Sequence, residues 1–312
     1  MKIVFDAHIP FLLEAVKEAW PQVEIVPLKP EEIDASAVRD ADVLVVRTRT
    51  KINEDLLAGS RAQLVCTATI GYDHIDAAYC EAQSIRWMSC PGCNAQAVCD
   101  FIEEVLDETH AQGTIGVVGV GHVGSLVARM AERKGMKVLL NDPPKRIGES
   151  LDFIEQKCDV ITFHVPLERS TYHMCDEAFL TKCKPGALII NAARGGVVDE
   201  LALLRSGHPY VLDTWENEPN LNTEVLQHAQ LASMHIAGYS VEGKRNATQM
   251  CLDAIAEQFG LPKIDLSGYR YTGITAQKGD SAPGWLSRIS ESLKADPTAF
   301  ESLRKAYPLR EG

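Results

Sequence analysis

The sequence predicts an α/β protein with two doubly wound, parallel-sheet domains. Short apolar segments alternate with stretches of helical periodicity along residues 1–260, which is the pattern of successive βα units. A glycine-rich turn, Gly116–Gly124, begins well inside the 312-residue chain, so the residues before it are numerous enough to form a separate domain. The contents of 46% hydrophobic and 24% charged residues are typical of a globular protein.

Residues 1–93 are expected to form the first domain, which would bind the substrate. The predicted strands are Lys2–Phe5, Val23–Pro27, Asp42–Arg47, Gln63–Ala68 and Ile85–Met88. The predicted helices are Pro10–Ala19, Ile52–Leu57 and Ile75–Ala82. This alternation predicts a parallel sheet with both faces covered. A long helix over residues 241–260 would return to complete this domain.

A second long helix, Asn94–His110, is expected to lead into a second domain over residues 94–240. There, Thr114–Val118 is typical of a buried strand and Val123–Lys134 of a helix. Between them the G-x-G-x-x-G spacing predicts a turn whose backbone amides bind a pyrophosphate at a helix N-terminus. We therefore predict a Rossmann domain in which the cofactor contacts are Gly119, Gly121, His122, Val123 and Gly124.

The next strand of this domain predicts the choice of cofactor. Asp142 follows Gly124 by 18 residues, close to the spacing of about 20 at which an acid binds a ribose 2′-hydroxyl. NAD is therefore expected, although Lys145 and Arg146 could instead meet a 2′-phosphate. Six strands are predicted in this domain. After Thr114–Val118 they are Val138–Leu140, Val160–Phe163, Ala187–Asn191, Val211–Asp213 and Leu231–His235.

Polar residues follow three of these strands, at the sheet edge where open parallel sheets bind ligands. Taken singly, Arg194 could be a solvated loop charge, Glu218 an ordinary acid beside Pro219 and His235 a core histidine with its hydrogen bonds satisfied. Together, a cation, an acid and an imidazole suit the oxidation of an alcohol next to a carboxylate. Arginine clamps the carboxylate, histidine takes the hydroxyl proton, and glutamate orients the histidine.

The overall charge argues against two classes of binding partner, and the cysteine pattern argues against disulfides and a metal site. A formal net charge of −12 argues against nucleic acid and anionic membranes, which are bound by basic surfaces. Since no apolar run is long enough to span a bilayer, a cytoplasmic protein is expected. The nine cysteines lie in apolar segments, as in a reducing compartment. Cys90-Pro-Gly-Cys93 lacks a second ligand pair, so we expect a buried turn and no metal site.

Four motifs resemble those of the D-isomer-specific 2-hydroxyacid dehydrogenases. They are Gly119–Gly124, Asn191–Asp199, Leu212–Pro219 and His235–Gly238. This resemblance implies that Arg194, Glu218 and His235 are catalytic, with His235 as proton donor and acceptor. It also implies that the cofactor contacts include Asp142, Val165, Asp213 and Gly238, with Val165 replacing the family's threonine. The substrate contacts that it implies are Thr48, Thr69 and Tyr239.

Within this family, Val46–Thr50, Thr67–His74 and Cys90–Ala95 resemble segments of members that oxidise a small phosphorylated hydroxy acid. If Val45–Lys51 is extended, Arg47, Arg49 and Lys51 alternate onto one side and could hold the phosphate. A solvated basic edge is the alternative interpretation. Other substrates within the family, such as glycerate, phosphoglycerate or a branched 2-hydroxy acid, stay open, as does a non-catalytic NADH-sensing protein.

Residues 261–312 differ from the family pattern. The family's C-terminal dimerisation region is shortened here, and only Trp285–Leu293 and Pro297–Ala306 are expected to be helical. The resemblance nevertheless implies a homodimer that pairs through helices of the cofactor domain.

Overall fold

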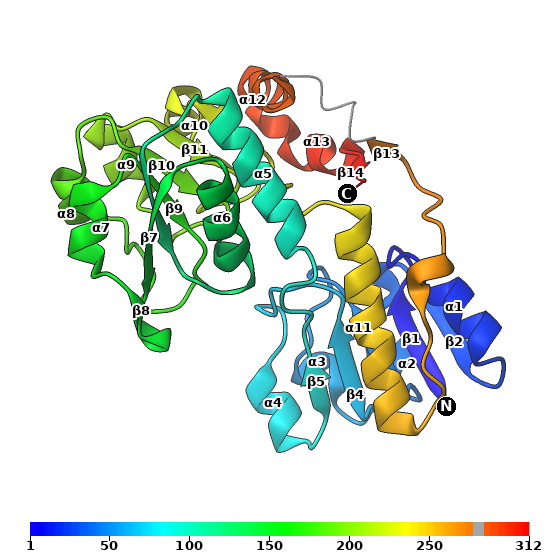
Figure 1. The fold of residues 1–312 in the computed structure, drawn as a ribbon. Helices are drawn as coiled ribbons and strands as arrows, with labels where there is room; N and C mark the ends of the chain where they lie inside the picture. Colours follow the sequence, from blue (N-terminus) through cyan, green and yellow to red (C-terminus); the bar gives the residue numbers. More distant parts are fainter. Residues whose placement is uncertain (277–283, 312) are drawn as a thin grey trace. The chain divides into compact units, whose positions relative to one another are not determined.

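The computed structural model describes residues 1–276 and 284–311. The described residues divide into two compact units: unit 1 contains residues 1–94 and 240–274, and unit 2 contains residues 95–239, 275–276 and 284–311. Each unit has its own parallel sheet with helices packed against it (Figure 1). The predicted α/β class with two parallel-sheet domains is confirmed. Within the described ranges, no helix is both long and apolar enough to cross a membrane.

Unit 1 is built on a five-stranded parallel sheet in the order β2-β1-β3-β4-β5. Its strands are β1 (Lys2–Asp6), β2 (Glu24–Leu28), β3 (Val43–Val46), β4 (Leu64–Thr67) and β5 (Arg86–Met88). Its helices are α1 (Leu12–Ala19), α2 (Ala35–Val38), α3 (Glu54–Leu57), α4 (Ala77–Ala82) and α11 (Val241–Phe259). All four residues of β3 and of β4 are buried, as expected for strands covered on both faces.

Helix α11 belongs to unit 1 and packs against β4 of its sheet (Figure 1). Ser240 caps its first turn by accepting a hydrogen bond from Gly243 N, and Gly260 ends it in the left-handed conformation. The chain continues in unit 1 only as far as Ile274, and from Thr275 its described residues belong to unit 2. Residues 277–283 and 312 of the expected C-terminal segment lie outside the described residues.

The expectation of an extended Val45–Lys51 segment is wrong. Strand β3 ends at Val46, and the chain turns at once, with Thr50 N donating to Arg47 O over 3.2 Å. The period-two argument for Arg47, Arg49 and Lys51 therefore does not apply. Arg47 instead binds Asp6 at the end of β1, through Nε–Oδ2 at 2.7 Å and Nη2–Oδ1 at 3.2 Å.

This ion pair stabilises the carboxyl ends of two neighbouring strands. The Asp6 side chain is fully buried, and burial alone would raise its pKa. The hydrogen bonds and charge of Arg47, together with His8, instead hold that pKa below its ordinary value. The Arg47 charge is therefore largely neutralised within unit 1.

Unit 2 is built on a seven-stranded sheet in the order β12-β11-β10-β9-β6-β7-β8, in which only β8 is antiparallel. The strands are β6 (Thr114–Val118), β7 (Lys137–Asp142), β8 (Ile147–Gly148), β9 (Val160–Phe163), β10 (Leu188–Asn191), β11 (Tyr210–Leu212) and β12 (Leu231–Ala232). Strand β6 lies between β7 and β9, so the direction of winding reverses beside it. Such a reversal is where doubly wound sheets bind ligands.

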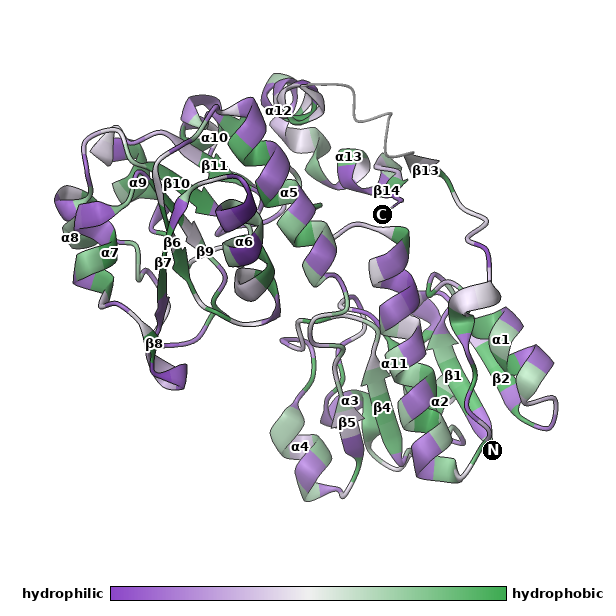
Figure 2. Cartoon of the chain, viewed as in Figure 1, coloured by the Kyte–Doolittle hydropathy of each residue, from purple (hydrophilic) through white to green (hydrophobic). Residues whose placement is uncertain are grey.

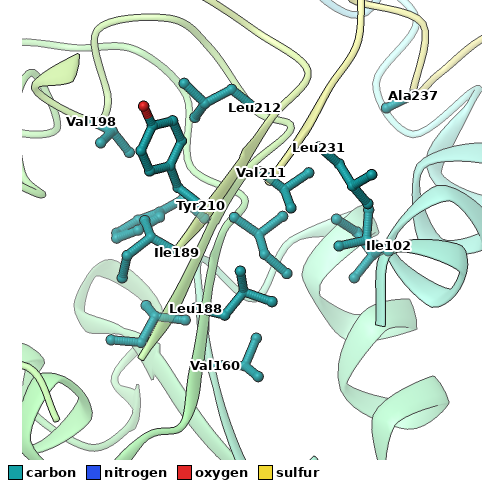
Figure 3. Close-up of a cluster of buried hydrophobic side chains, with 14 of the residues drawn as sticks. Ile102, Val160, Leu188, Ile189, Val198, Tyr210, Val211, Leu212, Leu231 and Ala237 are labelled. Atoms are coloured by element: carbon teal, nitrogen blue, oxygen red, sulfur yellow. The ribbon is translucent and has the colours of Figure 1, made fainter. Parts of the chain in front are cut away.

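The helices of unit 2 bury apolar faces against this sheet. They are α5 (Ala95–Glu108), α6 (His122–Arg133), α7 (Leu151–Lys157), α8 (Glu177–Lys182), α9 (Glu200–Ser206) and α10 (Thr223–His228). Figure 2 shows hydrophobic strands and helices with both polar and apolar sides. The core joins Ile102 of α5 to Val160, Ile189 and Val211 of the sheet (Figure 3).

The C-terminal part of unit 2 contains β13 (Thr275–Ala276), α12 (Trp285–Ala295), α13 (Phe300–Ala306) and β14 (Leu309–Arg310). Helix α12 packs against β12, where the Ser290 hydroxyl accepts a hydrogen bond from Ala232 N at 3.0 Å. The Glu108 carboxylate of α5 accepts hydrogen bonds from the backbone N–H groups of Leu286 and Ser287, which caps the start of α12. This C-terminal part is thus an integral part of unit 2.

We predict that Arg47→Met destabilises unit 1 by about 3 kcal/mol at neutral pH, because it leaves the buried Asp6 carboxylate without its main counter-charge. The loss should shrink as the pH falls far enough to protonate Asp6, since the neutral acid needs no cation. Urea denaturation, with hydrogen exchange of the β1 amides as a local measure, tests this. Arg61→Met is the control: its guanidinium is 58% exposed on Asp42, so its loss should cost less than about 1 kcal/mol. Equal effects of the two variants would contradict the prediction.

Candidate active site

The glycine turn after β6 has the close backbone contacts that a dinucleotide-binding turn requires. Gly119 has φ of +90°, and a Cβ atom there would lie 2.6 Å from the His164 carbonyl oxygen. A Cβ atom at Gly124 would overlap the carbonyl oxygen of Gly119. Glycine is therefore required at both positions. Helix α6 starts at His122, immediately after Gly121, and its first N–H groups face the turn, as pyrophosphate binding requires.

Asp142 lies at the end of β7, beside this turn. Its Oδ2 atom accepts a hydrogen bond from Val120 N at 2.8 Å, inside the G-x-G-x-x-G sequence. Lys145 is a close neighbour, with its Nζ atom 3.4 Å from Asp142 Oδ2 and 2.7 Å from Val120 O. The acid expected to bind the ribose thus also orders the turn, and a cation lies next to it.

Val165 and His164 close the other side of the turn. A Cβ atom at Gly119 would lie 2.9 Å from Cγ1 of Val165, so this predicted cofactor residue lies against the first glycine. His164 N donates to Val118 O at 2.7 Å, and its ring lies 3.0 Å from the Thr162 hydroxyl. Burial lowers the pKa of His164 to about 3, so its imidazole is neutral at physiological pH.

Arg194 lies in the loop after β10, and Asn191 shapes that loop with both ends of its amide. Asn191 Oδ1 accepts from Ala193 N at 3.1 Å, while its Nδ2 donates to Arg194 O at 2.8 Å. A Cβ atom at Gly195 would overlap the carbonyl oxygen of Trp215. The Arg194 loop is therefore packed tightly on the loop that carries Glu218.

Glu218 and His235 form a hydrogen-bonded pair. Glu218 Oε2 lies 2.9 Å from His235 Nδ1, and Glu218 Oε1 accepts from Trp215 N at 2.9 Å. Burial would raise the pKa of Glu218, but the hydrogen bond and charge of His235 hold it below its ordinary value. An ionised carboxylate on Nδ1 fixes the orientation of the ring and leaves proton exchange to Nε2.

Asp213 holds the His235 loop from within. The carboxylate is buried, and its oxygens accept hydrogen bonds from the Ser233 hydroxyl at 2.7 Å, Ile236 N at 2.7 Å and Ala237 N at 3.1 Å. These bonds support His235, whose backbone has φ of +57°. The predicted contact of Asp213 with the cofactor stays a prediction, whereas its anchoring of the loop is directly visible.

A second histidine, which the sequence analysis missed, joins the Arg194 and Glu218 loops. His173 N donates to Gly196 O at 2.7 Å, and its Nε2 atom lies 2.6 Å from Glu216 Oε1. The Glu200 carboxylate accepts from Glu216 N at 2.7 Å. Burial, and secondarily neighbouring acids, raise the pKa of Glu200 to about 7. Glu216 lies two residues before Glu218 in the same motif, but His173 carries no sequence signal that could have identified it.

The predicted substrate residues fall in both units. Thr48 and Arg49 lie in the exposed turn after β3 of unit 1. Thr69 donates a hydrogen bond to Gly71 O at 2.9 Å and lies 2.6 Å from the Thr67 hydroxyl. Gly238 and Tyr239 follow His235 in unit 2, where Tyr239 N donates to Ile236 O at 2.9 Å. Their substrate and cofactor roles stay predictions.

The Cys90–Cys93 turn is buried in unit 1. Burial raises the pKa of Cys93 to about 12, and Cys90 Sγ lies 3.8 Å from Cys251 Sγ. All nine cysteines belong to the described residues, and each is a buried thiol that forms no disulfide. Over those same residues, no group of three histidine, cysteine or acidic side chains is arranged to hold a metal ion.

Comparison with known protein families gives a match in unit 2. A family model described as the NAD-binding domain of D-isomer-specific 2-hydroxyacid dehydrogenases matches residues 100–238. This range contains the glycine turn, Asp142, Arg194, Glu218 and His235.

Full-length relatives and solved structures extend this similarity. An erythronate-4-phosphate dehydrogenase of Bacteroides fragilis is 41% identical over 342 residues, covering 99% of this chain and 97% of the relative. A protein of the same name from Porphyromonas gingivalis is 39% identical, covering 99% and 92%. NAD-bound 3-phosphoglycerate dehydrogenase of Entamoeba histolytica has a TM-score of 0.73 at 25% identity, covering 86% of this chain and 99% of that one. D-lactate dehydrogenase of Aquifex aeolicus, solved with NAD and lactic acid, has a TM-score of 0.68 at 26% identity, covering 83% and 96%.

We predict that Asp142→Ala lowers the preference for NAD over NADP by about tenfold or more, because the aspartate binds a ribose hydroxyl and repels a 2′-phosphate. The ratio of kcat/KM for the two cofactors measures this preference. Lys145→Ala removes the adjacent cation and should shift the ratio in the opposite direction. An unchanged ratio in Asp142→Ala would assign cofactor discrimination to other residues.

Proposed function

This chain belongs to the D-isomer-specific 2-hydroxyacid dehydrogenase family, and on that premise we propose that it oxidises 4-phospho-D-erythronate to 2-oxo-3-hydroxy-4-phosphobutanoate with NAD. The observation that carries the substrate assignment is the 41% identity, over 99% of the chain, to an enzyme named for that reaction. Relatives of the same name from several other bacteria support it. The reaction belongs to pyridoxal 5′-phosphate biosynthesis.

The cofactor is NAD, and unit 2 has the features needed to hold it. The Gly119–Gly124 turn leaves room that a Cβ atom would fill, the start of α6 provides N–H groups, and Asp142 lies at the end of the next strand. Structures of similar dehydrogenases have been solved with NAD bound. When bound, NAD accepts the hydride released from C2 of the substrate.

The catalytic steps of the protein itself follow from the Glu218–His235 pair. His235 Nε2 takes the proton of the C2 hydroxyl as the carbonyl forms, and Glu218 stabilises the resulting imidazolium through its bond to Nδ1. Arg194 pairs with the substrate carboxylate and polarises the forming carbonyl oxygen. In the reverse direction His235 donates the proton. Unit 1 is the substrate domain in this scheme.

We propose a cytoplasmic homodimer. The nine buried thiols, none of them in a disulfide, suit a reducing compartment. Dimerisation through helices of unit 2 follows from the family resemblance. Sedimentation at micromolar protein should give about twice the 34.2 kDa chain mass, and a species of the single-chain mass would contradict the dimer.

The substrate assignment predicts a large preference for the phosphorylated acid. Steady-state rates with 4-phosphoerythronate, erythronate, 3-phosphoglycerate and D-lactate under one set of conditions test it. We expect kcat/KM for 4-phosphoerythronate to exceed that for erythronate by at least about 100-fold, because the site's contacts with the phosphate would be left unpaired by erythronate. Equal efficiency would defeat the assignment, and NADH binding without turnover of any 2-hydroxy or 2-oxo acid would favour an NADH sensor.

We predict that His235→Gln lowers kcat by about 100-fold or more, the usual contribution of a positioned acid–base group. The affinity for NADH should stay within about threefold, because the imidazole acts on the substrate proton. Single-turnover kinetics and NADH fluorescence titration measure the two quantities. A near-normal rate would remove His235 from the mechanism.

A further inference from the structure

Both the N–H groups and the carbonyl groups of the loop after His235 form hydrogen bonds to charged side chains. Asp213 accepts hydrogen bonds from Ile236 N and Ala237 N. Arg310 of β14 donates through Nη2 to the carbonyl oxygens of the same two residues, and its backbone N–H donates to Tyr239 O at 3.4 Å. Strand β14 is thereby held beside the loop that carries His235.

This docking brings a second C-terminal cation, Arg304 of α13, to Tyr239. Arg304 Nε donates to the Tyr239 hydroxyl at 3.0 Å, and its guanidinium carbon lies 5.8 Å from the centre of that ring. Its side chain is 27% exposed, and its Nη1 atom is 3.6 Å from Glu301. The charge of Arg304 also acts on Glu218, whose pKa it helps to lower. Arg304 is therefore a part-buried cation at the catalytic pair.

The loops around Glu218 and Glu200 carry several acids. Asp199, Glu216 and Glu218 each act on the buried Glu200 through their charges. These acids would repel a substrate that carries both a carboxylate and a phosphate, unless local cations compensate. Two cations of the described part of unit 2 lie near Glu218. The Arg194 loop packs on the loop that carries Glu218, and the charge of Arg304 acts on the Glu218 carboxylate. Arg194 is assigned to the carboxylate, and Arg47 of unit 1 is neutralised by Asp6.

We propose that Arg304, supplied by the C-terminal segment and presented together with the Tyr239 hydroxyl, binds the phosphate of the substrate and so determines specificity. This proposal rests on the function proposed above. It gives the C-terminal segment a role in substrate recognition in addition to its packing role. A guanidinium is suited to this contact because its planar donors match phosphate oxygens in pairs.

The test compares Arg304→Gln, Arg304→Lys and Lys305→Gln in the full-length enzyme. Lys305 is exposed on the same helix, so its variant removes the same charge without removing the contact. We expect Arg304→Gln to raise KM for 4-phosphoerythronate about tenfold or more, the loss of one hydrogen bond to a charged group. KM for erythronate should change less than about threefold, Arg304→Lys should recover part of the loss, and Lys305→Gln should match the wild type.

Two outcomes overturn the proposal. In the first, KM of Arg304→Gln for 4-phosphoerythronate matches that of the wild type. In the second, KM rises equally for 4-phosphoerythronate and erythronate, which would assign Arg304 to the carboxylate that both substrates share. Tyr239→Phe separates a packing role: a guanidinium that only orders Tyr239 predicts equal rises of KM for 4-phosphoerythronate in Tyr239→Phe and Arg304→Gln, whereas direct binding of the phosphate by Arg304 predicts the larger rise in Arg304→Gln. Calorimetric binding of 4-phosphoerythronate to the NADH-loaded enzyme gives a readout that does not need turnover. If the wild type turns over phosphorylated and unphosphorylated acids equally, the proposed function fails; if it discriminates and only the Arg304 effect is missing, the inference alone fails.

Discussion

The bond between Glu218 Oε2 and His235 Nδ1 depends on two loops that leave different strands. His235 follows β12 and has a left-handed backbone conformation. This conformation costs a non-glycine residue energy, so it persists only where surrounding contacts hold it in place. The buried Asp213 carboxylate supplies such contacts, since releasing the loop would leave its oxygens unpaired away from water. The geometry of the imidazole is thus set by a group that does not itself need to touch the substrate.

The Glu218 loop is also held in place, but by backbone packing and by side chains other than Asp213. Gly195 allows the Arg194 loop to touch the backbone of Trp215, while His173 and Glu200 bind the side chain and the backbone N–H of Glu216. Acid–base catalysis is sensitive to displacements of about 1 Å. Anchoring both loops independently to the same sheet edge therefore keeps the carboxylate–imidazole distance fixed while substrate and cofactor exchange.

The parts of this arrangement that the sequence predicted depend on local patterns. Glycine spacing, apolar periodicity and the polar residues after β10, β11 and β12 are each encoded within short segments, so the fold class and the Glu218–His235 pair could be predicted. The extended Val45–Lys51 segment was predicted wrongly because no local pattern indicates the turn after Val46, and the Arg47–Asp6 pair could not be predicted because Asp6 lies on a different strand. His173, Arg304 and Arg310 escaped for the same reason: their roles come from contacts between segments far apart in the chain.

The distribution of charge reconciles an acidic chain with an anionic substrate. A net charge of −12 repels large polyanions over the whole surface, but that long-range field is screened beyond about 8–10 Å at physiological ionic strength. A small dianion that enters a site experiences mainly the groups within that range, where one unit charge at 4 Å interacts by about 4 kcal/mol at an effective dielectric of 20. A few well-placed guanidinium groups can therefore outweigh the acids around them. Arg47 is already paired with the buried Asp6, so less of its charge is available to that local balance. Arg304 contacts the Tyr239 hydroxyl, lies 3.6 Å from Glu301 and acts on Glu218, so its positive charge offsets acids that would otherwise repel an anionic substrate.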